Sequence, residues 1–257
     1  MDYFLGKVIF LTGASSGIGE ALALECARRG AIVGLFARRE ELLNELQLQI
    51  ESAGGAAKVF VGDVTDEEIV FDAAEQLRAE FGKIDILIAN AGIAGGNTDA
   101  RTYVPQAVKK VIDVNLMGAI NAVGAVLPEM INHNQGQIVA ISSLAGFRGL
   151  PRSGAYSASK AAMTNYFESL RLDVRDKDIS VTIIQPGFIK TPLTAARENR
   201  MPFLMELCDA LPHFMNAIER KKCFAAFPWQ LATVVRVARC FPCRLYDRIA
   251  GGVKYRE

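Results

Sequence analysis

The chain has 257 residues, of which 51% are hydrophobic and 22% charged, and its formal net charge is +1 at pH 7. This length suits one large domain or two small ones with a sizeable core, and the small charge gives no general attraction to nucleic acid. The first six residues lack the basic-then-apolar pattern of a signal peptide. We find no uncharged apolar run of about 18 residues and therefore expect no membrane-spanning helix.

The five cysteines are an odd number and lie mostly among apolar residues. Free thiols in a reducing compartment explain this usage, so we expect a cytoplasmic protein. Cys240 and Cys243 form a Cys-x-x-Cys pair, but a second metal-ligand pair and a strand-helix-strand context are both missing around it. The sequence therefore favours neither zinc binding nor thioredoxin chemistry, and we predict no metal site.

The chain begins with a strand, a glycine-rich turn and a helix. An apolar run predicts a buried strand over Lys7–Leu11, and apolar periodicity predicts a helix over Glu20–Arg29. Between them, Thr12-Gly-Ala-Ser-Ser-Gly-Ile-Gly19 carries three glycines at spacings that a plain turn does not explain. Gly13 allows a tight turn, the later two glycines let the backbone approach a pyrophosphate, and the helix N-terminus offers N–H groups to it. This stretch predicts a dinucleotide-binding site.

The second strand, predicted over Ala31–Phe36, is not followed by the acidic residue that would bind the ribose 2′-hydroxyl of NAD(H). Arg38 and Arg39 stand there instead. A carboxylate repels a 2′-phosphate, whereas a guanidinium binds it through charge-assisted, often bidentate hydrogen bonds. We therefore predict NADP(H) as the cofactor, bound through Arg38. For Arg39 two interpretations stay open: it binds the same phosphate, or it merely flanks the acidic first turn of the next helix.

Strands and helices alternate over the rest of the chain. The patterns predict helices over Glu40–Ser52, Asp66–Phe81, Tyr103–Asn132 and Ala155–Arg175, and strands over Ala56–Val61, Ile84–Ala89, Gln137–Ile141, Ile179–Ile184 and Cys223–Phe227. This alternation indicates a parallel sheet with helices on both faces. We predict a single doubly wound, Rossmann-type α/β domain over residues 1–257, with seven mostly parallel strands. A mid-helix asparagine competes for backbone hydrogen bonds, so Asn115 is expected to distort the long helix.

Tyr156 and Lys160 are four residues apart in a predicted helix, so their side chains share one face. An ammonium beside a phenol favours the phenolate and lowers the tyrosine pKa from its usual value of about 10. A tyrosine activated in this way is the general base that an alcohol requires. The pair alone is weak evidence, because a solvated helix face can carry the same spacing.

Together these motifs resemble the classical short-chain dehydrogenase/reductase family, and the match runs from Lys7 to about Phe227. The glycine-rich turn is similar to the family's cofactor motif. Asn90-Ala91-Gly92 is similar to its Asn-Asn-Ala-Gly motif, with Ala89 in place of the first asparagine. The segment from Pro186 to Thr191 resembles the one that binds the nicotinamide carboxamide. The residues that match the catalytic tetrad in order and spacing are Asn115, Ser143, Tyr156 and Lys160.

The resemblance implies hydride transfer between C4 of the nicotinamide and a carbinol carbon. Tyr156 would move the hydroxyl proton, Lys160 would lower its pKa and hold the nicotinamide ribose, and Ser143 would position the carbonyl oxygen. Asn115 would hold a water that relays protons to Lys160. Ser143 and Tyr156 would contact the substrate. The implied cofactor-binding residues are Gly13, Ser15, Ser16, Gly17, Ile18, Gly19, Arg38, Arg39, Asp63, Val64, Asn90, Ala91, Gly92, Tyr156, Lys160, Pro186, Gly187, Ile189 and Thr191.

Two other functions stay open, because a fold does not fix a function. The first is a non-catalytic NADP-binding sensor or scaffold, which would have no need to keep all four members of the tetrad. The second is an epimerase or dehydratase, which would carry further acid/base residues that this sequence lacks.

Family members commonly pair through long helices, so the resemblance also implies a homodimer or homotetramer.

Residues 1–190 are predicted to form the cofactor-binding and catalytic core, and residues 191–222 the substrate lid. The lid contains Met201–Met205 and Leu211–Met215, which are rich in adaptable side chains. A mobile lid over an apolar substrate and a buried helix pair are both open interpretations. His213 and His133 are expected to be structural or solvated.

Residues 229–257 form a basic tail with six basic and two acidic residues, a net charge of +4, so the remainder of the chain carries −3. Leu231, Val234, Val235 and Ala238 fall on one helical stripe. Pro242 is expected to end this helix before a second, short one. The stripe either docks on the protein's own body or a sister subunit, or lies on an anionic membrane surface. We favour docking, because apolar stripes usually face a core.

Overall fold

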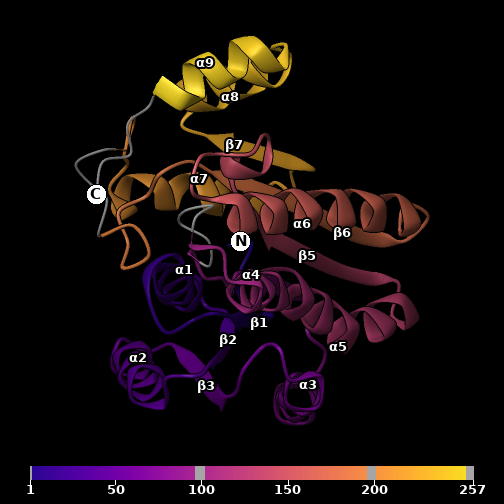
Figure 1. Cartoon of the computed structure of the whole chain (residues 1–257). Coiled ribbons are helices and arrows are strands. Elements are labelled where there is room, and N and C mark those ends of the chain that lie inside the picture. Colours follow the sequence, from indigo (N-terminus) through magenta and orange to yellow (C-terminus); the bar gives the residue numbers. More distant parts are fainter. Residues whose placement is uncertain (1, 96–101, 196–200, 253–257) are drawn as a thin grey trace.

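Seven strands form one sheet in the order β3-β2-β1-β4-β5-β6-β7, and each strand pair is parallel. The computed structural model describes residues 2–95, 102–195 and 201–252 (Figure 1). The chain starts in the middle of the sheet, adds strands out to β3, returns to β4 and adds strands to the other edge. The order therefore reverses between β1 and β4, as in the predicted doubly wound fold, which is confirmed.

The elements lie close to the ranges predicted from the sequence. The strands are β1 Val8–Thr12, β2 Ile32–Ala37, β3 Ala56–Val61, β4 Ile86–Ala89, β5 Gln135–Ile141, β6 Asp178–Pro186 and β7 Phe224–Phe227. The helices are α1 Gly17–Arg28, α2 Glu40–Ser52, α3 Glu67–Phe81, α4 Pro105–Ile112, α5 Gly118–Asn132, α6 Gly154–Asp173, α7 Leu207–Glu219, α8 Trp229–Arg239 and α9 Cys243–Gly252. Helix α1 begins earlier than predicted, inside the glycine-rich turn.

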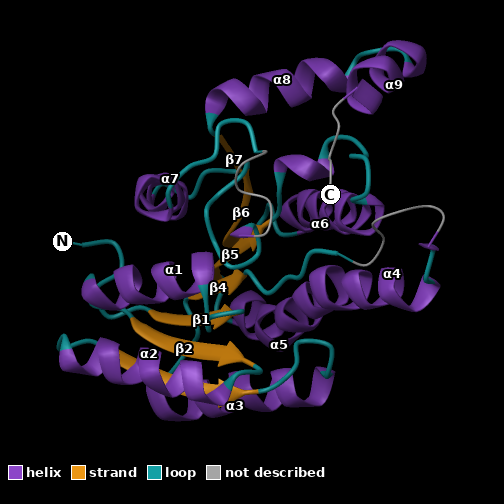
Figure 2. Cartoon of the chain, turned by 60° about the vertical axis from the view of Figure 1, so that its left-hand side comes forward, coloured by secondary structure: helices purple, strands orange, loops and turns teal. Residues whose placement is uncertain are grey.

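Helices cover both faces of the sheet (Figure 2). On one face, Leu22 of α1 and Phe214 of α7 belong to one buried apolar cluster. On the other face, Leu77 of α3 and Phe167 of α6 belong to a second. Strand β1 contributes to both clusters, because successive side chains of a strand point to opposite faces. Burial of both faces explains why the strands read as continuous apolar runs rather than alternating ones.

The long helix predicted over Tyr103–Asn132 is interrupted by a π-helical turn, η2, over Asp113–Met117. Asn115 lies in this turn, so the predicted distortion is confirmed. By length and composition the described stretch Pro105–Asn132 could cross a membrane, which differs from our sequence-based expectation. Half of its most apolar window is buried, and it packs against α3, α6 and the sheet. This packing explains why the stretch is apolar, because it is a core helix.

The region predicted as a lid contains a core helix. Leu211–Met215 lies in α7, where Phe214 and Met215 are buried and α7 packs against α1. For this part of residues 191–222, the buried-helix interpretation describes the structure. His213 and His133 are both exposed.

Helices α8 and α9 lie together beyond β7, at one end of the molecule (Figures 1 and 2). They are separated at Pro242, as predicted. Leu231 and Ala232 of α8 are buried in a small cluster with Leu144, so one side of the tail does dock on the protein's own body. Val234, which we expected on the docked side, is instead exposed. Compared with our prediction, the helix is rotated about its axis, so that Ala232 packs against the body in place of Val234.

Candidate active site

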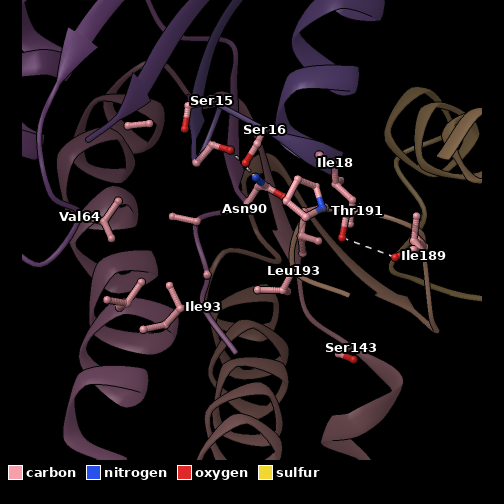
Figure 3. A pocket seen from close by; sticks show the side chains of 18 of the residues that line it. Ser15, Ser16, Ile18, Val64, Asn90, Ile93, Ser143, Ile189, Thr191 and Leu193 are labelled. Carbon is pink, nitrogen blue, oxygen red and sulfur yellow. Dashed lines mark hydrogen bonds between the residues drawn. The ribbon is translucent and has the colours of Figure 1, made fainter. Parts of the chain in front are cut away.

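A cavity of about 420 Å³ lies at the carboxyl ends of the strands (Figure 3). It is bounded by the glycine-rich turn, the segments after β2 to β6, and the start of α6. Ligands of open α/β sheets bind at this edge. The predicted site residues that line the cavity are Gly13, Ser15, Ser16, Gly17, Ile18, Arg38, Arg39, Asp63, Val64, Asn90, Ala91, Gly92, Ser143, Tyr156, Lys160, Pro186, Gly187, Ile189 and Thr191. Two predicted residues, Gly19 and Asn115, are not part of this lining.

Sequence reasoning missed several residues of the lining. They are Ala37, Gly62, Ile93, Val114, Ile141, Pro192, Leu193 and Thr194. Most of these residues are next to predicted site residues at strand ends. Their position in the sequence could therefore have been used to predict them. Val114 is next to the predicted residue Asn115, but it comes from the π-helical turn within a helix and not from a strand end. Ser142, next to the predicted Ser143, also lines the cavity, as its position in the sequence suggests.

The glycines shape the turn after β1. Gly13 and Gly17 have φ values of +70° and +61°, in the left-handed region that glycine adopts without strain. A Cβ added at Gly13 would lie 2.7 Å from the Cα of Ala91. A Cβ added at Gly19 would overlap the carbonyl oxygen of Gly13, so Gly19 serves the close packing of α1 on the turn.

Asn90 ties this turn to the neighbouring strand. Its side-chain amide donates hydrogen bonds of 3.1 Å to the carbonyl oxygens of Thr12 and Gly13. The hydroxyl of Thr12 accepts from the backbone N–H groups of Asn90 and Ala91 at 3.1 and 3.2 Å. These bonds join the carboxyl ends of β1 and β4, the two strands between which the sheet order reverses.

Two guanidinium groups stand at the end of β2. Nη1 of Arg38 lies 3.4 Å from a carboxylate oxygen of Asp63. Arg39 reaches the glycine-rich turn and donates to the hydroxyls of Ser15 and Ser16 at 2.9 and 2.6 Å. Partial burial raises the pKa of Asp63, but hydrogen bonds from the next turn and the charge of Arg38 outweigh it, so this pKa lies below its usual value. Positive charge and hydroxyl groups therefore meet on this part of the cavity wall.

Ser143, Tyr156 and Lys160 come together beyond β5, where Ser143 precedes the short 3₁₀ turn η3 (Leu144–Gly146) and the other two lie in α6. The buried Nζ of Lys160 donates to the carbonyl oxygen of Ile141 at 2.7 Å and lies 5.9 Å from the centroid of the Tyr156 ring. Burial lowers the pKa of Lys160 to about 8. Lysine at this pKa is still largely cationic at neutral pH.

The pKa of Tyr156 differs from our expectation. Burial raises it, and a hydrogen bond with Ser143 acts in the opposite direction. The lowering predicted from the neighbouring ammonium is thus not the dominant effect in this structure. The physical reason is that Lys160 makes its hydrogen bond to a backbone carbonyl, while the phenol is removed from water.

Asn115 joins three parts of the site. Its Oδ1 accepts from the backbone N–H of Ile93 at 2.7 Å, and its Nδ2 donates to the carbonyl of Ile93 and to the hydroxyl of Ser159, both at 3.0 Å. The side chain is fully buried. It therefore fixes the segment after β4 against α6, next to Lys160. A Cβ added at Gly92 in this segment would lie 3.6 Å from Nζ of Lys160.

Among the described residues, no group of three or more His, Cys, Asp or Glu side chains could hold a metal ion. The polar side chains that line the cavity carry hydroxyl, amide, ammonium, guanidinium and carboxylate groups. A family model described as short chain dehydrogenase matches residues 7–202. The chain belongs to the short-chain dehydrogenase family of oxidoreductases.

Two related sequences cover three quarters of the chain or more. The chain is 43% identical over 244 residues to an uncharacterised oxidoreductase of Myxococcus xanthus, and the match covers 95% of this chain and 96% of that one. It is 37% identical over 193 residues to an 11-beta-hydroxysteroid dehydrogenase A of Sesamum indicum, over 75% of this chain and 55% of that one.

Solved structures of the family show the same architecture. A short-chain dehydrogenase/reductase from Burkholderia phymatum, in complex with NAD, has a TM-score of 0.85 and 25% identity to this chain, and the match covers 93% of this chain and 94% of that one. A metagenomic short-chain oxidoreductase in complex with NADP has a TM-score of 0.68 and 33% identity, over 72% and 84%. The family thus includes members that bind each of the two dinucleotides.

Proposed function

We propose that this dehydrogenase transfers a hydride between NADP(H) and a carbonyl group or secondary alcohol of an apolar small molecule. The observation that carries the proposal is that Ser143, Tyr156 and Lys160 line the same cavity as the glycine-rich turn and the arginines after β2. One cavity thus combines a proton-transfer group with groups suited to phosphate.

The residues present fit a dinucleotide. At Gly13 and Gly17 the backbone is left-handed and carries no side chain, which leaves the turn open to a close approach by phosphate. A Cβ at Gly17 would lie 3.3 Å from the side chain of Thr191, so a larger residue would crowd the space between the two segments. When bound, the cofactor would supply or accept the hydride.

The choice of NADP(H) over NAD(H) rests on the groups after β2. Arg39 and the hydroxyls of Ser15 and Ser16 form a cluster of donors, and Arg38 stands beside them. Guanidinium and hydroxyl donors are what a 2′-phosphate requires. At the end of β2, Ala37 stands where an acid would favour NAD(H).

In the proposed reduction, Tyr156 gives its phenolic proton to the carbonyl oxygen of the substrate, and in the oxidation it takes the proton back. The hydroxyl of Ser143 holds the same oxygen by a hydrogen bond. Lys160 remains largely cationic at neutral pH, and its charge stabilises the phenolate once Tyr156 has given up the proton. Asn115 fixes the backbone beside Lys160 through Ile93; the water relay through Asn115 is part of the proposal.

An apolar substrate is supported by other residues of the lining. Ile93, Val114, Pro192 and Leu193 contribute apolar surface to the cavity.

By analogy with its family we propose a homo-oligomer. All five cysteines are free thiols, which supports a location in the cytoplasm.

A panel of apolar ketones, aldehydes and secondary alcohols, followed by the absorbance of NADPH and NADH, tests the proposal. We expect turnover of at least one compound, faster with NADP(H) than with NAD(H) at equal concentration. Tight NADPH binding without turnover of any compound would favour the sensor or scaffold function. Failure to bind either dinucleotide would contradict the proposal as a whole.

A further inference from the structure

Helix α8 has apolar residues on two opposite sides. The inner side packs against the body through Leu231 and Ala232. On the outer side Trp229 is 72% exposed and Val237 is 52% exposed. These two residues are a little more than two helical turns apart, so their side chains lie on the same half of the helix. Docking of the inner side does not account for an apolar outer side.

Helix α9 continues this exposed surface. Leu245 and Ile249 are four residues apart, and both are exposed. Arg244 and Arg248 directly precede them and are also exposed. Within the described part of the chain, neither arginine takes part in an ion pair or hydrogen bond. Two adjacent stripes of α9, one cationic and one apolar, therefore face the solvent.

The two helices are held firmly to the loop that follows the active-site strand β5. The guanidinium of Arg148 donates to the carbonyl oxygen of Phe241 at 2.9 Å and lies 3.8 Å from the centroid of the Tyr246 ring. The hydroxyl of Tyr246 donates to the carbonyl of Gly149 at 2.6 Å. The outer residues are thus presented in a fixed orientation beyond β7 (Figures 1 and 2). We call this set the tail surface; it consists of Trp229, Val234, Val237, Arg244, Leu245, Arg248 and Ile249.

We propose that the tail surface binds an anionic lipid bilayer. Residues 229–257 carry six basic and two acidic residues, a net +4, in a chain whose total charge is +1. An anionic bilayer therefore attracts the tail, while the remainder of the chain, at −3, is repelled. Exposed tryptophan and aliphatic side chains enter the interfacial region, and arginines pair with lipid phosphates.

A second copy of this chain fits the same surface less well. In a two-fold dimer the same patch meets itself, so Arg244 and Arg248 of one copy would face the same arginines of the other. An anionic bilayer offers opposite charge to the whole surface at once. Charge complementarity therefore favours the bilayer as the occupant.

Trp229 is the only tryptophan in the chain, so intrinsic tryptophan fluorescence reports on the tail surface alone. The probe is a vesicle of phosphatidylcholine with about one third phosphatidylglycerol, at low salt. We expect a blue shift of the emission and co-sedimentation with the vesicles. Both should be weak with phosphatidylcholine alone and should decrease as salt is added.

Two pairs of substitutions and their matched controls test the assignment. Arg244→Gln with Arg248→Gln, and Val237→Ser with Ile249→Ser, should each weaken vesicle binding by about tenfold or more. The controls change equally exposed residues elsewhere: Arg175→Gln with Lys177→Gln, and Leu48→Ser with Leu172→Ser. The controls should change vesicle binding by less than about twofold, and thermal melting should show that all variants are folded.

Three results would overturn the proposal. One is the absence of a blue shift and of co-sedimentation with anionic vesicles. Another is an equal loss of binding in the tail variants and their controls. The third is a blue shift without vesicles that grows with protein concentration and accompanies a larger mass in light scattering, which would assign the surface to a second copy of this chain.

Discussion

The guanidinium of Arg39 donates a 2.6 Å hydrogen bond to the hydroxyl of Ser16, which links the end of β2 to the glycine-rich turn. The sequence left two interpretations open for Arg39, and this contact sets its guanidinium in the wall of the cavity. Arg38, on which the cofactor prediction rested, lies nearby, is exposed and contacts Asp63.

The cofactor preference should therefore depend on both arginines. Arg38→Ala and Arg39→Ala should each raise the Kd for NADPH by about 10- to 100-fold, since each removes charge-assisted hydrogen bonds. The Kd for NADH, which has no 2′-phosphate, should change little and serves as the internal control. Both constants can be measured by cofactor fluorescence. Equal losses for the two dinucleotides would mean that the arginines support the fold of the turn rather than select the phosphate.

Lys160 should give stability a specific pH dependence. Its pKa in the folded protein is about 8, below the usual 10.5. Between these values the unfolded chain binds a proton that the folded protein does not, so the free energy of unfolding rises with pH over this window. The rise should be on the order of 3 kcal/mol.

Lys160→Met removes this titration and is the matched reference. Urea unfolding at a series of pH values should show the stability of the parent rising relative to that of the variant between about pH 8 and 10.5. Parallel stability curves for parent and variant would show that Lys160 is not held at a lowered pKa.

Asn115 should contribute to stability through its three hydrogen bonds. Asn115→Ala leaves the N–H and C=O of Ile93 and the hydroxyl of Ser159 without this partner in a buried site. We expect a loss of about 2–4 kcal/mol in the free energy of unfolding. Asn121→Ala, on the same long helix, removes one bond to the carbonyl of Val64 and should cost less. Equal losses in the two variants would argue against a joining role for Asn115.

Much of the fold could be predicted because its signals are local. The glycine-rich turn and the apolar runs of the strands depend on neighbours in the sequence, and they placed most of the cavity wall at the strand ends. The distortion at Asn115 could also be predicted, because a polar side chain within an apolar helix is a local signal. Its partners could not, since Ile93 and Ser159 are brought to it by tertiary packing.

The pKa of Tyr156 and the orientation of α8 show where local reasoning ends. The spacing of Tyr156 and Lys160 gave the correct face of the helix, but not the depth of burial or the bond from Lys160 to Ile141. For α8 the apolar periodicity correctly predicted a helix, but several rotations of that helix about its axis are compatible with the same periodicity. The choice of Ala232 over Val234 as the inner residue depends on the shape of the body that the helix meets.

The most direct test of the proposed function is Tyr156→Phe, which removes only the hydroxyl that moves the proton. The control is Tyr166→Phe, which removes a hydroxyl from the same helix outside the cavity lining. With a substrate from the panel, kcat of Tyr156→Phe should fall by about 100-fold or more while the Kd for NADPH and the Tm stay close to those of the parent. Tyr166→Phe should keep its kcat within about twofold. Activity retained by Tyr156→Phe would contradict the account, because another group would then carry the proton.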